Sequence, residues 1–202
     1  MGVITMTKIN GDDMDKSYRT ASRLIQARFI QSPELAQQFG QLEKVVPIIV
    51  KGQHDHIEQI FQALDFRYEP ATLDALSKAN PTPERPIFIN CGSSEPNRNT
   101  IALLNEHVHE GGVVITTDWC LHHIVERAFP DYIRWTKTKT GGSNESFPVE
   151  FILEEFKEKH HDLAPSWFVE NSSYPLEILK PEEVRVILKS DEFGKKYGCN
   201  PA

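Results

Sequence analysis

Two short apolar runs, residues 87–90 and 113–117, flank a segment of helix length that ends in a Gly-Gly pair. The order strand, helix, Gly-Gly, strand predicts a βαβ unit of a parallel sheet. A third apolar run at 45–50 predicts an earlier strand, and apolar residues at helical spacing over 54–64 predict the helix that follows it. Strands and helices therefore alternate, which favours a doubly wound, mainly parallel α/β sheet with right-handed crossovers.

The remaining pattern adds shorter elements to this core. Further strands are predicted at residues 66–69, 131–135, 168–169, 176–179 and 184–188, and further helices at 70–76, 97–109 and 120–129. Residues 136–147 contain Gly141 and Gly142 beside small polar side chains, a composition typical of loops. We expect a mobile loop there, with residues 138–144 lying over the site as a lid.

The N-terminal part differs in composition from the rest of the chain. Residues 1–16 are polar and acidic and are expected to be disordered or flexible. Apolar side chains over 17–31 fall at helical spacing. A second helix is predicted to follow, with Ser32 as its N-cap, Pro33 at its first helical position and Gly40 as its C-cap.

These patterns divide the chain into a flexible segment at 1–16, a helical extension at 17–42 and an α/β domain at 43–202. The apolar stripe along residues 18–42 must cover another surface. It either packs on the flank of the α/β domain or builds a homodimer with a second copy of the chain. The sequence leaves both arrangements open.

Composition narrows the class of protein. With 202 residues, 39% of them hydrophobic and 25% charged, the chain has the make-up of a soluble globular domain. A net charge of -7 argues against nucleic acid as a partner, because phosphate contacts need clustered Lys and Arg. No apolar run approaches the roughly 20 residues of a membrane span, and no signal peptide is recognisable. Three cysteines without a Cys-x-x-Cys pair predict a reduced, cytoplasmic protein.

Polar and reactive side chains follow two of the predicted strands. Asn90 and Cys91 end the first strand of the βαβ unit, and Asp118 and Trp119 follow the second. Parallel sheets bind ligands at the carboxyl ends of their strands. The predicted ligand pocket is therefore lined by Gly52, His54, Asp55, Asn90, Cys91, Gly92, Asp118, Trp119 and His122.

Two residues of this pocket are candidates for catalysis. Cys91 precedes a helix whose amino end would lower the thiol pKa, and a His could accept its proton. Alternatively, Cys91 is a small buried residue in a tight turn, and the same two interpretations apply to Cys120. Asp118 either binds a ligand hydroxyl or a metal, or only caps the next helix. Trp119 needs a surface to lie against, which is either core or a sugar-like ligand.

The histidines occur in pairs along the chain, which is a reason to consider a metal site. His107 and His109 end their helix at the opposite edge of the sheet, where interaction with the helix carboxyl end is a sufficient explanation. A divalent metal site at the ligand edge would draw on His54, His56, His122, His123, Asp55, Asp118 and Cys91. Apart from this alternative, the sequence predicts no cofactor.

Four segments carry a resemblance to known proteins: GQHDHIEQIFQALDF (52–66), IFINCGSS (87–94), LLNEHVHEGGVVITTDWCL (103–121) and SSYPLEIL (172–179). Over about residues 45–190 the chain resembles the class I glutamine amidotransferase-like superfamily, in particular its ThuA-like, trehalose-utilisation-type branch. The resemblance implies a three-layer, flavodoxin-like α/β sandwich with a sharp nucleophile elbow after the Gly-Gly helix and its strand.

The sequence departs from that family at the catalytic positions. An amidotransferase of this class carries Cys at the elbow within Gly-x-Cys-x-Gly, followed later by His-x-Glu. Here the elbow reads Thr-Thr-Asp-Trp-Cys over 116–120, without flanking glycines, and no His-x-Glu follows it. The family's final strand and Gly-x-Gly turn, expected after 195–200, are also missing from the sequence. Either another element closes the core or the family member is shortened.

Three functional hypotheses follow. In the first, the domain lacks the Cys-His-Glu triad and is not an enzyme but a binding or regulatory module for a small polar ligand or a protein partner. In the second, it is a hydrolase or isomerase of a small polar or sugar-like substrate, using Cys91 or Asp118 with a His. In the third, residues 18–42 build a structural homodimer and the pocket is vestigial.

Overall fold

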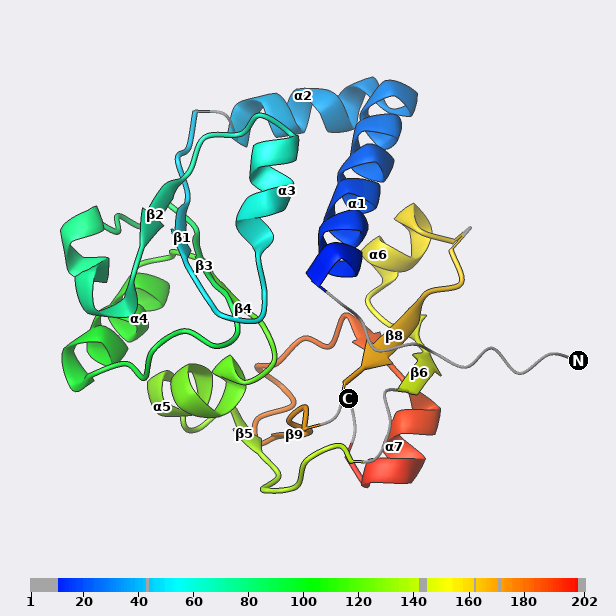
Figure 1. Ribbon diagram of the computed structural model, residues 1–202. Helices are drawn as coiled ribbons and strands as arrows, with labels where there is room; N and C mark the ends of the chain where they lie inside the picture. The colour runs from blue at the N-terminus through cyan, green and yellow to red at the C-terminus, as the bar shows by residue number, and fades with distance from the viewer. Residues whose placement is uncertain (1–10, 43, 142–144, 162, 171, 200–202) are drawn as a thin grey trace, which may run out of the picture.

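Four short parallel strands form the central sheet (Figure 1). The computed structural model describes residues 11–42, 44–141, 145–161, 163–170 and 172–199. The strands, in the spatial order β2-β1-β3-β4, are β1 (Ile48–Val50), β2 (Glu69–Ala71), β3 (Ile87–Ile89) and β4 (Val114–Thr116). The predicted parallel α/β sheet is confirmed for this part of the chain, although β2 begins three residues later than expected.

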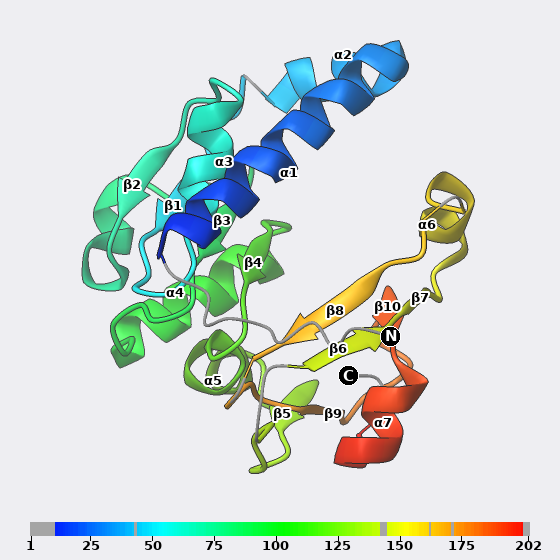
Figure 2. The same cartoon turned by 45° about the vertical axis from the view of Figure 1, so that its right-hand side comes forward.

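Different helices cover the two faces of this sheet. One face carries α3 (Ile57–Ala63), and the other carries the 3-10 helix η1 (Leu73–Ala79) and α4 (Arg98–His109) (Figure 2). Right-handed crossovers explain this division, because the step from β1 to β2 runs in the opposite direction along the sheet from the steps that lead to β3 and β4.

The central strand β1 is the most completely buried element, and each of its three residues has an exposed fraction of 0%. Ile48 and Val50 pack with Leu104 of α4 in one cluster. On the other face Phe88, the register partner of the middle residue of β1, meets Phe61 of α3 with 5.3 Å between ring centroids. The apolar run at 45–50 is therefore continuous because both of its faces are covered.

The N-terminal helix begins earlier than the sequence suggested. Helix α1 (Gly11–Gln31) includes residues 11–16, which we expected to be disordered, while residues 1–10 lie outside the described residues. It packs against α3, and the Tyr18 hydroxyl accepts a hydrogen bond from the His56 N–H at 2.9 Å. The extension thus covers the flank of the α/β domain, one of the two arrangements we considered.

The second helix, α2 (Pro33–Leu42), starts at the predicted Pro33. Gly40 lies inside it instead of capping its end, so that part of the prediction is wrong. The outer side of α1 leaves two apolar side chains in solvent, Leu24 with 63% and Ile30 with 84% of its surface exposed. A homodimer through residues 18–42 stays a prediction.

After β4 the chain builds antiparallel strand pairs, so the parallel sheet is smaller than the pattern predicted. The pairs are β5 (Ile133–Trp135) with β9 (Leu176–Ile178), β6 (Glu145–Pro148) with β8 (Ser166–Val169), and β7 (Glu150–Phe151) with β10 (Leu188–Lys189). The remaining helices are the π-helical turn η2 (Leu121–Val125), α5 (Glu126–Ala128), α6 (Glu154–Lys159) and α7 (Asp191–Tyr197). Phe147, Val169, Phe193 and Cys199 form a second, smaller core.

The expected mobile loop at 136–147 is held at both ends. Its last three residues belong to β6, and Thr140 is buried with 3% of its surface exposed. The Thr140 N–H donates to the Ser173 carbonyl at 3.0 Å, and its hydroxyl donates to the Glu170 carbonyl at 2.6 Å. The part of the predicted lid at 138–141 is therefore tied down, and residues 142–144 lie outside the described residues.

The Gly-Gly pair after α4 has a specific structural reason. Gly111 adopts a φ of +94°, in the left-handed region that glycine favours. Gly112 passes directly over the buried His107 ring, and a Cβ placed there would lie 2.4 Å from His107 Nε2. The turn from α4 into β4 thus needs a residue without a side chain at its second position.

Replacing Gly112 by Ala should lower the free energy of unfolding by about 1–3 kcal/mol, because the new methyl group would overlap the buried His107 ring. Gly40→Ala is the matched control, since nothing lies within 4 Å of a Cβ there and the residue is inside α2. The control should gain about 0.5–1 kcal/mol. Urea unfolding of the two variants measures both changes, and equal stabilities would contradict this account of the turn.

Candidate functional site

Three loops meet at the carboxyl edge of the parallel sheet, and the side chain of Thr117 joins them. The Cys91 N–H, after β3, donates to Thr117 Oγ1 at 2.9 Å. The Thr117 hydroxyl in turn donates to the carboxylate of Asp55 in the loop after β1. Thr117 was not among the predicted pocket residues, although its position at the end of an apolar run was a signal for it.

The two glycines of the predicted pocket allow these loops to approach closely. A Cβ on Gly52 would lie 2.1 Å from the carbonyl oxygen of Cys91, and one on Gly92 would lie 2.7 Å from Cδ2 of His54. Gly92 also has a φ of +78°. The structure therefore assigns both glycines to the packing of the loops against each other.

Asn90 is buried beneath the site, with an exposed fraction of 1%. Its side chain accepts a hydrogen bond from the Ile57 N–H at 3.2 Å and donates to Glu58 Oε2 at 2.9 Å. Glu58 also contacts His56, with 3.2 Å between Oε1 and Nδ1. The His-x-Glu spacing of residues 56–58 was a signal for this partly buried polar network, which fixes the start of α3.

The turn after β4 is an elbow with Asp118 at its apex. Asp118 has a φ of +35°, which is uncommon for a residue other than glycine. Its carboxylate accepts hydrogen bonds from the Tyr174 N–H at 3.3 Å and from the Ser173 hydroxyl at 3.5 Å. Partial burial raises the pKa of Asp118, and the nearby carboxylates of Asp55 and Glu170 raise it further.

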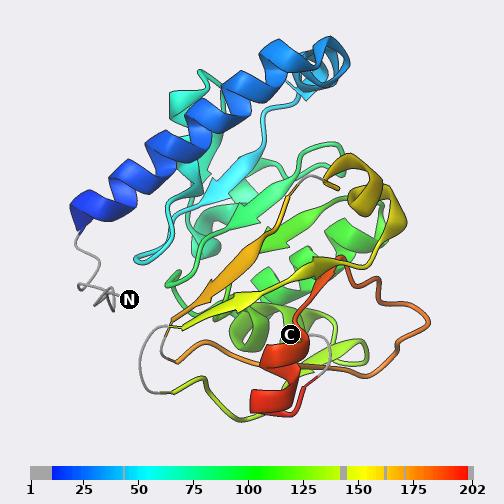
Figure 3. The same cartoon turned by 90° about the vertical axis from the view of Figure 1, so that its right-hand side faces the viewer.

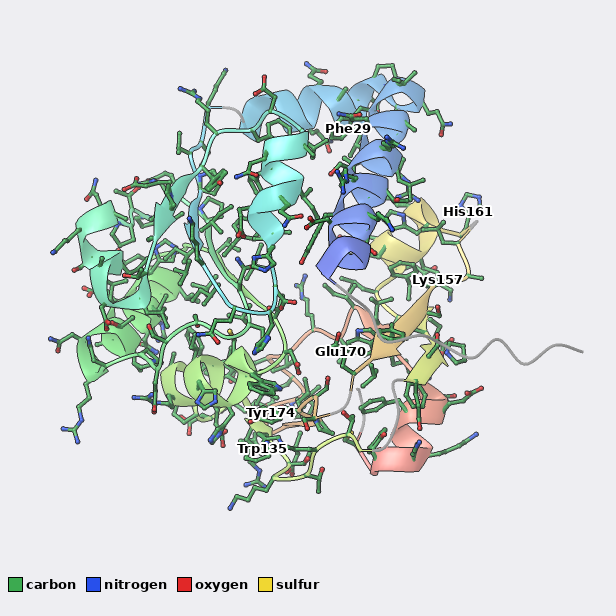
Figure 4. All side chains as sticks on the ribbon, viewed as in Figure 1. Phe29, Trp135, Lys157, His161, Glu170 and Tyr174 are labelled. Atoms are coloured by element: carbon green, nitrogen blue, oxygen red, sulfur yellow. The ribbon has the colours of Figure 1, made fainter. Side chains whose placement is uncertain are left out.

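Aromatic rings stack beside this elbow. Trp119 lies parallel to Tyr174 with 5.8 Å between centroids, and Tyr174 lies on Trp135 at 4.5 Å (Figure 4). His54 meets the Trp119 ring edge-on at 5.6 Å. The Trp119 indole N–H donates to the Ser172 carbonyl at 2.9 Å. The surface that Trp119 needed is therefore provided largely by the protein itself.

A positive charge lies over this stack. Lys139 Nζ is 5.1 Å from the centre of the Tyr174 ring and 5.7 Å from that of Trp119. Cation–π contacts of this kind stabilise the arrangement by about 0.5–1 kcal/mol when exposed. The stacked rings are thus held in place before any ligand arrives.

The cysteines are buried, and burial raises the pKa of each thiol. Cys91 has 4% of its surface exposed; burial raises its thiol pKa, and the charges of Asp118 and Asp55 raise it further. Cys120 is 3% exposed, and burial raises its pKa to about 12. The thiolate is the reactive form of cysteine. The placement of both residues therefore favours the interpretation of small buried side chains over that of a nucleophile.

The histidines do not gather into a metal centre. Within the described ranges, no group of three or more His, Cys, Asp or Glu side chains is arranged to hold a metal ion. His122 instead pairs with Glu126 at 2.8 Å, one turn further along the chain. His123 has a pKa lowered by burial and by the neighbouring His122. His107 and His109 end α4, as predicted.

A cleft of about 1240 Å³ opens from the elbow and runs along β4. Of the predicted pocket residues, His54, Asp55 and Asp118 line it, whereas the others lie behind or beside it. Ser173 and Tyr174 line the same end, and sequence reasoning missed both because they come from a distant loop. We call the end formed by His54, Asp55, Asp118, Ser173 and Tyr174 the head of the cleft.

Comparisons of the chain with models of protein families, with curated proteins and with solved structures found no match. Among the described helices, none has both the length and the apolar composition needed to cross a bilayer.

The raised pKa of Asp118 leads to a prediction about stability. A carboxyl group with a raised pKa contributes stability fully below its unfolded pKa and loses that contribution as the pH rises through its folded pKa. Asp118→Asn, which keeps an oxygen for the Tyr174 N–H, should therefore raise the free energy of unfolding at pH 7 by up to about 1 kcal/mol, since the carboxyl is partly solvated. The gain should shrink as the pH falls toward about 3.

Urea unfolding at several pH values measures this difference. Asp131→Asn, at an exposed turn, is the control and should change the free energy of unfolding by less than about 0.5 kcal/mol throughout. A less stable Asp118→Asn protein at pH 7 would mean that the carboxylate supports the elbow instead of straining it.

Proposed function

We propose that the chain is a binding domain of the class I glutamine amidotransferase-like type, on its ThuA-like branch, that holds a small polar ligand at the head of the cleft and does no thiol chemistry. The strand order β2-β1-β3-β4 supports this assignment, because it corresponds to the first four strands of the flavodoxin-like order. Three free cysteines support a cytoplasmic location.

The observation that carries the proposal is the strained elbow at Asp118. In folds with a nucleophile elbow, the residue at the sharp turn from strand to helix is presented above the sheet. Here that position, after β4, is occupied by a carboxylate with a φ of +35°. Backbone strain of this kind costs about 1–3 kcal/mol and tends to persist where it serves a function.

The polar side chains at the head of the cleft indicate which chemical groups a ligand would carry. Asp55 and Asp118 offer carboxylate oxygens to the cleft, and both accept hydrogen bonds from hydroxyl donors of the protein, Thr117 and Ser173. A ligand that binds there would supply further O–H or N–H donors. Hydroxylated molecules such as sugars and polyols fit these acceptors, as do amines.

A second candidate function is a hydrolase that uses Asp118. The raised pKa of Asp118 supports it, because a carboxyl group whose pKa is raised holds a proton more readily and is a better general acid. His54 lines the same end of the cleft and is the nearest candidate for a partner. Hydrolysis of p-nitrophenyl esters distinguishes the two functions: activity that survives Cys91→Ala and disappears in Asp118→Asn would establish the enzyme.

The binding function is tested with glucose, trehalose and glucosamine as probes, followed by the indole N–H signals of the three tryptophans in NMR spectra. We expect the Trp119 signal to shift in a saturable way with at least one probe. Asp118→Asn should weaken that binding at least tenfold, because a hydrogen bond to a charged group contributes about 1.5–3 kcal/mol. Since this variant should be at least as stable as the parent, loss of binding would not reflect unfolding.

Asp131→Asn is the matched control, because Asp131 lies at an exposed turn and does not line the cleft. Its affinity for the same probe should stay within a factor of two. If no probe shifts the Trp119 signal at millimolar concentration, or if Asp118→Asn binds as well as the parent, the head of the cleft is not a site for these ligands.

A further inference from the structure

Beyond the head, the cleft continues as a trough between β4 and β8. Val114 and Thr116 line it from one side, and Trp167, Phe168 and Val169 from the other. Figures 2 and 3 show β8 running beside β4, with β6 on its far side. The cleft of about 1240 Å³ is larger than the about 300–1,000 Å³ typical of small-molecule sites. The head alone does not account for this space.

Within the described residues, the backbone of β4 has no strand partner on the side of the trough. The Ile87 N–H donates to the Val113 carbonyl at 2.9 Å, and Ile87 is the register partner of Val114. In a parallel ladder this places the polar groups of Val113 and Ile115 toward β3 and those of Val114 and Thr116 away from it. Among the described residues, β4 pairs with β3 alone.

On the opposite wall, β8 also lacks a strand partner on its trough side among the residues that the structure describes. The Val149 N–H donates to the Pro165 carbonyl at 3.1 Å, which marks that pair as hydrogen-bonded. In the antiparallel register of β6 and β8, the hydrogen-bonded pairs alternate with others. The polar groups of Ser166 and Phe168 therefore point away from β6, and β8 has β6 as its single strand partner within the described residues.

Charge is concentrated at one end of the trough. Asp118 follows β4 and Glu170 follows β8, so both strands end at the head of the cleft, and the two carboxylates are close enough to raise the pKa of Asp118. Asp55 adds a third carboxylate at the same end. The trough thus has an apolar middle, bordered by backbone groups of β4 and β8 that have no strand partner among the described residues, and an acidic end at the head of the cleft.

We infer that the trough binds an extended polypeptide strand of a separate protein, with alternating apolar side chains and a basic residue at the end that meets Asp118 and Glu170. Such a strand adds to both open edges, as in other cases of β-augmentation. Backbone N–H and C=O groups of Val114, Thr116, Ser166 and Phe168 supply its partners. The inference does not depend on a ligand at the head of the cleft.

The test uses fluorescein-labelled heptapeptides of alternating valine and threonine, with one lysine at the amino or the carboxyl end. Fluorescence polarisation with the full chain should show saturable binding of at least one of them. Methylating the backbone nitrogens of every second residue removes the donors along one edge and keeps the side chains. Both methylated versions of the better peptide, one for each edge, should bind at least tenfold more weakly.

Variants of the protein locate the binding. Val114→Pro removes an outward N–H and leaves the ladder with β3 intact, so it should weaken the peptide at least tenfold. Ile115→Thr is the control on the same strand, since Ile115 does not line the cleft, and should leave affinity unchanged. Glu170→Gln should weaken the lysine peptide several-fold and leave a norleucine version unaffected.

Two outcomes would overturn the inference: no saturable binding of either peptide up to millimolar concentration, or methylated peptides that bind as tightly as their parents. The second would show that the trough takes apolar groups without strand pairing. The methylated peptides decide the question even if Val114→Pro fails to fold. Neither result depends on whether glucose, trehalose or glucosamine binds at the head.

Discussion

The complete burial of β1 is the constraint on which the rest of the molecule depends. A three-residue strand with no exposed surface needs strands on both edges and helices on both faces. The chain meets this need with β2 and β3 at the edges, α3 on one face, and η1 with α4 on the other. Parallel pairing then brings the loops after β1, β3 and β4 to one end of the sheet, where Asp55, Thr117 and Asp118 meet.

Local pattern was enough to predict the parallel half of the fold. The apolar runs and the helix-spaced segments between them can each be recognised within a few residues, and the Gly-Gly pair reflects a local contact, the approach of Gly112 to His107. The antiparallel half depends on partners far apart in sequence. Strand β6 pairs with β8, and both β7 and α6 lie between these strands in the sequence. Nothing near Glu145 therefore indicates that the expected loop ends in a strand.

The same distinction holds at the site. Asp118 and His54 were predicted because they follow elements with clear patterns, and both line the cleft. Tyr174 and Ser173 were missed because a loop more than fifty residues downstream brings them to the elbow. The chemistry of Cys91 could not be read from its position after a strand, since its burial depends on Thr117 and on the loop after β1.

One hydrogen bond links the helical extension directly to the α/β domain. The Tyr18 hydroxyl accepts a hydrogen bond from the N–H of His56, the N-cap of α3, and the Asn90 side chain accepts one from the next N–H in the chain. Helix α1 and the end of β3 therefore hydrogen-bond to two adjacent residues where the loop after β1 enters α3. The two segments are separate in sequence, but local unfolding of the N-terminal helix would remove a hydrogen-bond partner from the loop that carries His54 and Asp55 to the cleft.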